Sequence, residues 1–131
     1  MQALPLRLTP GQDLRLAIEA ALGRHTAAFV LQGIGSLSVA QLRYAGVEAL
    51  TTLRGDLEIL TLAGSVSPDG AHLHMALSDA QGRVHGGHVG VGCIVRTTAE
   101  LLLAVLPDHV FSRAFDGAGS GFDELLIRPQ R

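Results

Sequence analysis

From Thr26 onward, apolar residues recur mostly at every second position, the period of a β-strand with one buried face. Glycines punctuate these runs, for example at Gly33 and Gly35 and again at Gly86 and Gly87. The chain has 131 residues, 16 glycines, 4% aromatic residues and no tryptophan, so its core must be aliphatic. We therefore expect mostly strands joined by tight turns, with enough chain to bury a core without disulfides.

One segment near the amino terminus has helical spacing instead. Its starting signals are Thr9 as the N-cap, Pro10 in the first turn and Gln12 at the capping-box position. Apolar residues then recur at helical spacing over residues 14–22, and Gly23 suits a left-handed helix end. The sequence predicts one helix here, capped by Thr9.

The remaining pattern predicts a series of short strands within a single domain covering residues 1–131, since no repeat or linker interrupts it. Residues 54–56 indicate a turn or a bulge between two runs. Residues 94–106 fit either a long strand or a helix starting at Thr98, and their β-branched first half favours a strand. The other predicted strands are residues 4–8, 28–31, 37–44, 50–53, 57–62, 72–78, 84–91 and 125–127.

Composition excludes some classes of function. The net charge is −2, the pI is about 6.3 and lysine is absent, so nothing would attract phosphates and direct DNA binding is disfavoured. The longest apolar run, residues 101–106, is too short to cross a membrane. A single cysteine, Cys93, and an amino terminus without signal-peptide features predict a cytoplasmic protein with a buried, unpaired thiol.

Three histidines form the best candidate site. Read as a strand, residues 72–78 place His72 and His74 on one face and apolar residues on the other. His88 follows on the next strand, beyond a turn at residues 79–82. Three neutral imidazoles converging from adjacent strands could bind zinc or another divalent metal and leave a position open. The alternative is that they are surface or hydrogen-bonded core histidines; His85 is expected at the surface.

A carboxylate also stands out. Strand parity would place Glu58 on the same face as Leu60 and Leu62, where an unpaired charge would be costly. Its partner could be Arg43, Arg96 or a metal ion. A structural ion pair or a subunit contact is the alternative to a functional role.

Several motifs resemble, in order, the plant and prokaryote conserved (PPC) domain, over about residues 6–106. They are Pro10-Gly11-Gln12-Asp13-Leu14, Gly33-Ile34-Gly35-Ser36-Leu37, Leu42-Arg43-Tyr44, residues 55–64, His72-Leu73-His74, Gly86-Gly87-His88 and residues 95–100. The resemblance implies an α+β fold, with a mainly antiparallel sheet and a packed helix, assembled as a homotrimer. It also implies the stand-alone prokaryotic form, because the Arg-Gly-Arg-Pro core of the plant AT-hooks is absent.

The fold of that family is similar to that of acetolactate decarboxylase, a zinc enzyme. The order of its metal ligands matches His72, His74 and His88, and Glu58 and Arg43 are candidates for its additional carboxylate and arginine. The segment of plant relatives implicated in partner contacts matches residues 55–60.

The sequence therefore leaves two main hypotheses for the function. The first is a trimeric module that binds a metal and a small anionic ligand, with Arg43 or Arg96 holding the anion; whether it is an enzyme stays open. The second is a protein-interaction domain linked to transcription. A DNA-binding role without an AT-hook is a third and physically weaker alternative.

Overall fold

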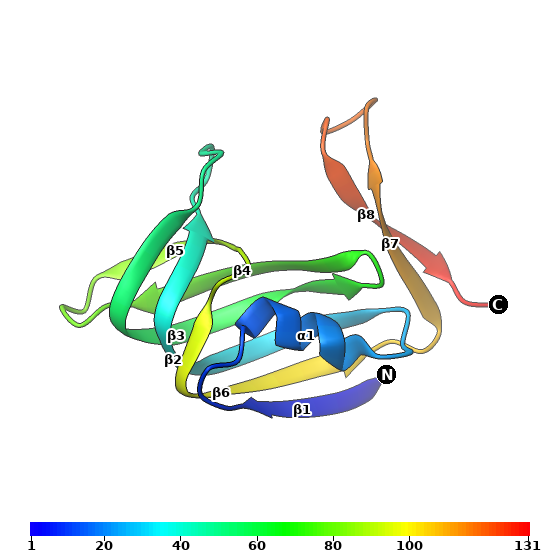
Figure 1. The fold of residues 1–131 in the computed structure, drawn as a ribbon. Helices are drawn as coiled ribbons and strands as arrows, with labels where there is room; N and C mark the ends of the chain where they lie inside the picture. Colours follow the sequence, from blue (N-terminus) through cyan, green and yellow to red (C-terminus); the bar gives the residue numbers. More distant parts are fainter.

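The computed structural model describes residues 1–131 and contains one helix and eight strands (Figure 1). In chain order these are β1 (Gln2–Leu8), α1 (Leu14–Leu22), β2 (Ala28–Arg43), β3 (Thr51–Ser67), β4 (Gly70–Ser78), β5 (Val84–Val89), β6 (Ile94–Val105), β7 (His109–Phe115) and β8 (Asp123–Pro129). The expectation of a mainly antiparallel sheet with one packed helix is confirmed. With only nine residues, α1 is too short to span a bilayer.

Six strands form one antiparallel sheet in the order β1-β6-β2-β3-β4-β5. The end of β2 also pairs with β5, so β2, β3, β4 and β5 close into a ring at that end. The helix α1 packs against one side of this sheet, while β7 and β8 form a separate hairpin that projects away from it (Figure 1). Strand β7 was not predicted from the sequence.

The helix begins later than predicted. Asp13, not Thr9, is the N-cap: its Oδ1 accepts a hydrogen bond from the Leu16 amide at 3.0 Å. Its Oδ2 accepts a second one from the Gly92 amide at 2.7 Å, which links the helix start to the turn before β6. Gly11 has a positive φ of 87°, outside the helical region, so the Thr9–Gln12 segment is a turn rather than a first helical turn. The predicted end at Gly23 is confirmed.

The ambiguous segment is a single strand, β6, which pairs with β1 on one side and β2 on the other. Its buried residues alternate as Ala99, Leu101 and Leu103, and the exposed Glu100 and Leu102 lie between them. Strand β2 pairs with β6 from Ile94 to Val105 and β1 pairs with its residues 99–105, and this excludes the helical alternative.

Strands β2 and β3 are longer than the sequence suggested, because bulges carry them through the predicted breaks. The two runs predicted at residues 28–31 and 37–44 join in β2, and those at 50–53 and 57–62 join in β3. The β2–β3 register shifts between Leu37 and Val39, opposite residues 54–57, so the bulge interpretation of residues 54–56 is confirmed.

Candidate metal site

Strand β4 carries two of the three histidines on one face. Leu73 and Met75 are buried in the core, while His72 is half-buried and His74 is exposed on the opposite face. The alternation predicted for this strand is therefore confirmed. Because successive strand residues point to opposite sides, the two imidazoles project together.

Strand β5 brings the third histidine beside them. His88 is paired with His74 across β4 and β5, and with Arg43 across β5 and β2. A Cβ atom on Gly87 would lie 2.7 Å from the Arg43 carbonyl oxygen, so only glycine permits this close approach of β5 to β2. The glycines before His88 thus allow its strand to pair on both sides.

The three imidazoles converge. Ring centroids are 5.0 Å apart for His72 and His74, 5.1 Å for His72 and His88, and 5.8 Å for His74 and His88. Each offers a ring nitrogen, and these three atoms lie within 4.8 Å of one another. Tetrahedral zinc with Zn–N distances of about 2.0–2.1 Å needs nitrogens about 3.4 Å apart, so modest side-chain rotations would close the set.

The surroundings of His72 and His88 favour their neutral forms. Burial lowers the pKa of His88 to about 4, and the positive charges of Arg43 and Arg15 act in the same direction. Burial likewise lowers the pKa of His72, with a further contribution from Arg113. Metal binding requires an unprotonated nitrogen, so both shifts prepare these side chains to act as ligands at neutral pH.

One observation shows that the donor set suits a metal. The Nδ1 atom of His88 is buried and has no hydrogen-bond partner. A buried polar atom without a partner costs free energy, and a metal ion bound to this nitrogen would supply the missing partner. Three imidazole nitrogens also match the ligand preference of zinc, nickel or copper rather than that of calcium or magnesium.

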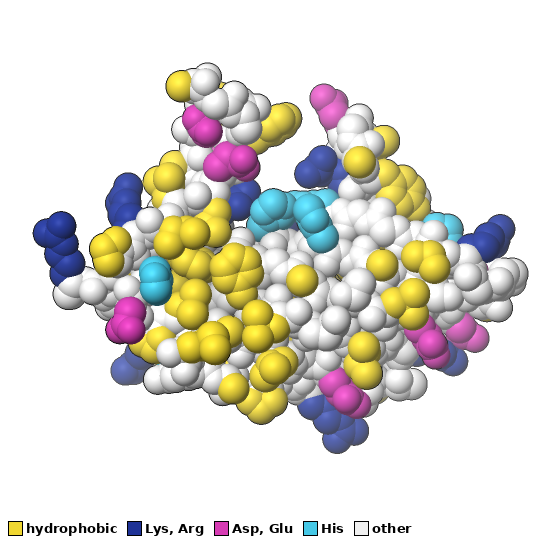
Figure 2. Space-filling view, turned by 180° about the vertical axis from the view of Figure 1, so that it is seen from behind, with side chains coloured by type: hydrophobic (Ala, Val, Ile, Leu, Met, Phe, Trp, Pro, Cys, Tyr) yellow, Lys and Arg dark blue, Asp and Glu magenta, His cyan; other side chains and the backbone are white.

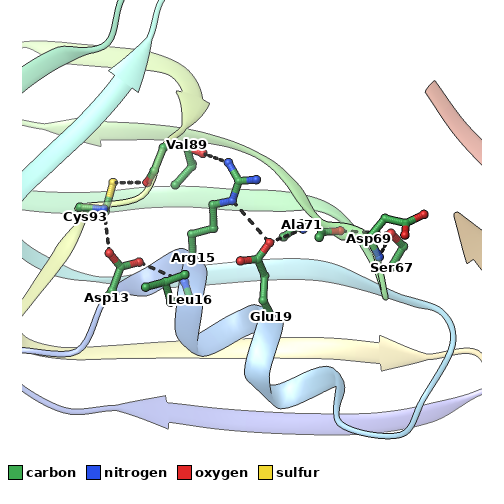
Figure 3. Close-up of polar contacts among 12 residues, drawn as sticks. Asp13, Arg15, Leu16, Glu19, Ser67, Asp69, Ala71, Val89 and Cys93 are labelled. Atoms are coloured by element: carbon green, nitrogen blue, oxygen red, sulfur yellow. Dashed lines mark hydrogen bonds and ion pairs between the residues drawn. The ribbon is translucent and has the colours of Figure 1, made fainter. Parts of the chain in front are cut away.

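The helix α1 holds the backbone next to two of the histidines (Figure 3). Glu19 accepts a hydrogen bond from the Ala71 amide at 2.8 Å, and Arg15 donates one to the Val89 carbonyl at 3.3 Å. Ala71 precedes His72 and Val89 follows His88, so one face of the helix fixes the position of both strands. Figure 3 shows both side chains reaching from α1 to the strands.

The histidines lie in a notch of the molecular surface. Figure 2 shows them together between two projecting parts of the molecule. A cavity of about 710 Å³ opens at His72 and His74 and extends between the sheet and the β7–β8 hairpin. Its other lining residues are Phe29, Val30, Leu31, Ala63, Gly64 and Ser65 of the sheet, and Arg113, Glu124 and Leu125 of the hairpin. The wall is largely apolar and the charged groups come from the hairpin.

The other residues predicted for the site are not all brought to it. Arg43 is exposed but lies beside His88, whose pKa its charge lowers. Arg96 forms an exposed ion pair with Asp56, at 3.2 Å, and does not line the cavity. A role of Arg43 or Arg96 in ligand binding stays a prediction.

The strand parity assumed for Glu58 is wrong. A register shift between Ile59 and Thr61 inserts Leu60 as an extra residue, so Leu62 is buried while Glu58 is exposed. Glu58 lies five residues before Ala63, the partner of His74, which is about 16 Å along β3. It therefore needs no buried partner, and no ion pair holds it.

The sequence analysis missed Arg113. Its guanidinium Nη1 lies 3.3 Å from Nδ1 of His72, and Nη2 donates to the Asp123 carbonyl at 2.7 Å. Residues 110–114 do not alternate between apolar and polar side chains, so the sequence carries no clear strand signal there.

Two further predictions concern residues outside the cavity. His85 is half-buried, and its Nε2 is 3.0 Å from Oδ2 of Asp79, apart from the three-histidine cluster. Cys93 is fully buried, and burial raises the pKa of its thiol, as expected for a structural cysteine.

Comparison with known proteins shows to which family this chain belongs. The sequence profile of the Plants and Prokaryotes Conserved (PCC) domain matches residues 1–107, so this chain belongs to that family. It is the same family that the sequence motifs resembled, where it was called the PPC domain. The β7–β8 hairpin lies beyond the matched residues.

Particular relatives share the fold along nearly the whole chain. A hypothetical protein from Salmonella enterica is 41% identical, with a TM-score of 0.94 over 99% of this chain and 95% of that one. A metal-containing protein from Archaeoglobus fulgidus is 30% identical, with a TM-score of 0.76 over 96% and 94%.

A curated relative is much longer than this chain. The bifunctional protein GlmU of a Synechococcus strain is 47% identical over 98% of this chain, which spans only 21% of that relative.

Proposed function

We propose that this protein is a metal-binding domain in which His72, His74 and His88 coordinate zinc or another divalent ion. The observation that carries the proposal is the convergence of three ring nitrogens within 4.8 Å, from two adjacent strands. The metal-containing relative from Archaeoglobus fulgidus, similar over most of both chains, supports it.

The arrangement would leave coordination positions open toward the cavity. Three protein ligands plus an exchangeable position are the arrangement of catalytic rather than structural zinc sites. A bound divalent ion would polarise a carbonyl or carboxylate oxygen of a small ligand. The chain itself supplies an apolar wall and the nearby cations Arg113 and Arg43, which favour an anionic ligand.

The test is elemental analysis of protein purified without chelators or affinity metals, compared with His74→Ala. We expect about one divalent ion per chain in the wild type and loss of it in the variant. The matched control is His25→Ala, because His25 is an exposed histidine outside the cluster. Absence of metal in the wild type, followed by failure to take up added zinc, would contradict the proposal.

We also propose that the domain assembles as a homotrimer. Support comes from an apolar patch on the outer surface of β2, β3 and β6, where Ile34, Leu60 and Leu102 are between 40% and 52% exposed. Ile34 shares one surface groove with Leu60 and another with Leu102, so the three side chains form one patch. Exposed apolar patches commonly mark association surfaces.

Light scattering after size-exclusion chromatography measures the assembly. We expect a mass of three chains for the wild type and a smaller species for Ile34→Glu, with Val84→Glu, on an exposed residue elsewhere, as the control. A monomeric wild type would contradict this proposal.

The second candidate function is binding of a protein partner through the same surface. Leu60 belongs to this patch and the exposed Glu58 lines the same groove, so both side chains would then contact the partner. Normal metal content together with a monomeric wild type would direct attention to this alternative.

A further inference from the structure

The contact between Arg113 and His72 has a chemical consequence. A guanidinium only donates hydrogen bonds, so Nδ1 of His72 must accept at the 3.3 Å contact with Nη1 of Arg113. A neutral imidazole that accepts at Nδ1 carries its proton on Nε2. Neither nitrogen is then free for a metal: Nδ1 is occupied by Arg113 and Nε2 holds the proton.

Coordination by His72 therefore requires Arg113 to leave it. If Nδ1 binds the metal, its lone pair is taken; if Nε2 binds, the proton moves to Nδ1, which can no longer accept. Arg113 would nevertheless stay nearby, because its backbone amide donates to Asp69 at 2.9 Å and Nη2 donates to the Asp123 carbonyl. Arg113 lines the cavity together with His72, so the freed Nη1 group would be available to a ligand there.

We infer that Arg113 is the anion-binding residue of this site, pairing with the head group of a small monocarboxylate whose apolar chain lies in the cavity. This inference rests on the proposed metal site and deepens it. The other candidate arginines are less suitable, because Arg96 is paired with Asp56 and neither Arg96 nor Arg43 lines the cavity.

The cavity itself indicates the class of ligand. Its volume of about 710 Å³ is in the range of small-molecule sites, about 300–1,000 Å³. Phe29, Val30, Leu31 and Leu125 offer apolar surface to a hydrocarbon chain. Glu124 lines the same cavity and would repel a second negative charge, which favours a monoanion over a dianion.

The experiment measures calorimetric affinities of zinc-loaded protein for hexanoate and acetate at equal ionic strength. For the wild type we expect hexanoate to bind about tenfold tighter than acetate, because its longer chain buries more apolar surface. Arg113→Met should weaken hexanoate binding by about tenfold or more while zinc content stays unchanged. Arg113→Lys, which keeps the charge without the planar fork, should recover part of the affinity.

The matched control is Arg7→Met, which removes an exposed arginine of β1 that does not line the cavity and should leave hexanoate affinity within about twofold. Urea unfolding of each variant verifies that the domain is folded. Equal affinities of wild type and Arg113→Met, or equal losses in the Arg113 and Arg7 variants, would overturn the inference while zinc content upholds the metal site. A wild type that takes up no zinc overturns the proposed function, and the inference with it.

Discussion

The sheet with its helix and the C-terminal hairpin are stabilised in different ways. The first region contains a cluster of 24 buried apolar residues, contributed by one face of α1 and by six strands. In β7 and β8, by contrast, Phe111 is the one buried residue, and Phe115, Leu126 and Ile127 are exposed. An isolated two-stranded hairpin is marginally stable in water, so its contacts with the sheet must hold it in place.

The candidate site lies where these two regions meet. The histidines belong to the well-packed sheet, while Arg113 and Glu124 belong to the outlying hairpin. The difference suggests a division of roles: the sheet sets the metal geometry, and the hairpin supplies the groups that contact a ligand. Stability and ligand recognition should then respond to different substitutions.

The largest expected contrast comes from the same substitution made in both regions. Leu62→Ala removes a side chain that is fully buried in the sheet and should cost about 2–5 kcal/mol of unfolding free energy. Leu126→Ala removes a leucine of the hairpin that is 37% exposed and should cost less than about 1 kcal/mol. Urea unfolding followed by circular dichroism gives both values; similar costs would mean that the two regions are equally packed.

A smaller effect on global stability is expected from loosening the hairpin. Phe111 packs edge-to-face on Phe29, with ring centroids 5.6 Å apart, and its amide bonds the Thr26 carbonyl at 2.9 Å. Phe111→Ala should leave the sheet folded but raise the rate of tryptic cleavage after Arg113 by about tenfold or more, since about 1.4 kcal/mol of lost attachment gives that factor.

Cleavage after Arg54 in β3 provides the internal control, because it reports on the sheet of the same sample. Faster cleavage at both sites would show that the hairpin and the sheet unfold together.

The pH dependence of unfolding of the metal-free protein should report on the sheet, where the half-buried His88 lies. Burial holds the pKa of His88 at about 4 in the folded state, below the ordinary value of 6.5. Between these values the unfolded chain binds a proton that the folded chain does not, so stability is full above pH 6.5 and falls as the pH is lowered toward 4. His88→Gln should make this loss shallower in urea unfolding at pH 7, 5.5 and 4.5.

His25→Gln serves as the matched control, since His25 is exposed in the turn after α1. If His88→Gln follows the wild-type slope, the buried imidazole does not contribute to the acid response.

The smallest effect is expected from one hydrogen bond between the regions. The Thr26 hydroxyl donates to the carbonyl of His109, the first residue of β7, at 2.6 Å. Thr26→Val keeps the shape and removes the donor, and should reduce the opening free energy of the hairpin by about 0.5–1.5 kcal/mol. Hydrogen exchange of amides in β7 measures this, and unchanged exchange there would show that other contacts hold the hairpin.

The histidine cluster could be predicted from the sequence because each feature that brings the three side chains together is local. Alternation along β4 sets the common face of His72 and His74, and a short turn sets the adjacent strand. The glycines before His88 indicated a close approach of backbones, and the structure shows why it is needed. Local period and turn chemistry thus predicted these positions.

Other features depend on interactions that sequence spacing does not reveal. The bulge at Leu60 reverses the strand parity on which the expectation for Glu58 depended. The helix starts at Asp13 because this side chain also bonds the Gly92 amide, 79 positions away. Arg113 reaches His72 across 41 positions, from a strand whose sequence lacks the alternation that predicts strands. In each case a tertiary contact decides the outcome, not a local propensity.

The closure of β5 onto β2 also bears on how the protein avoids aggregation. An open sheet exposes the backbone groups of an edge strand, which can pair with another chain. Because β5 is paired on both sides, part of this end of the sheet offers no such edge, whereas β1 at the other end has only β6 as a neighbour. The middle of β1 contains Pro5, which has no amide hydrogen to donate to an incoming strand. The glycines that place His88 in the site therefore also shield a sheet edge from strand-to-strand self-association.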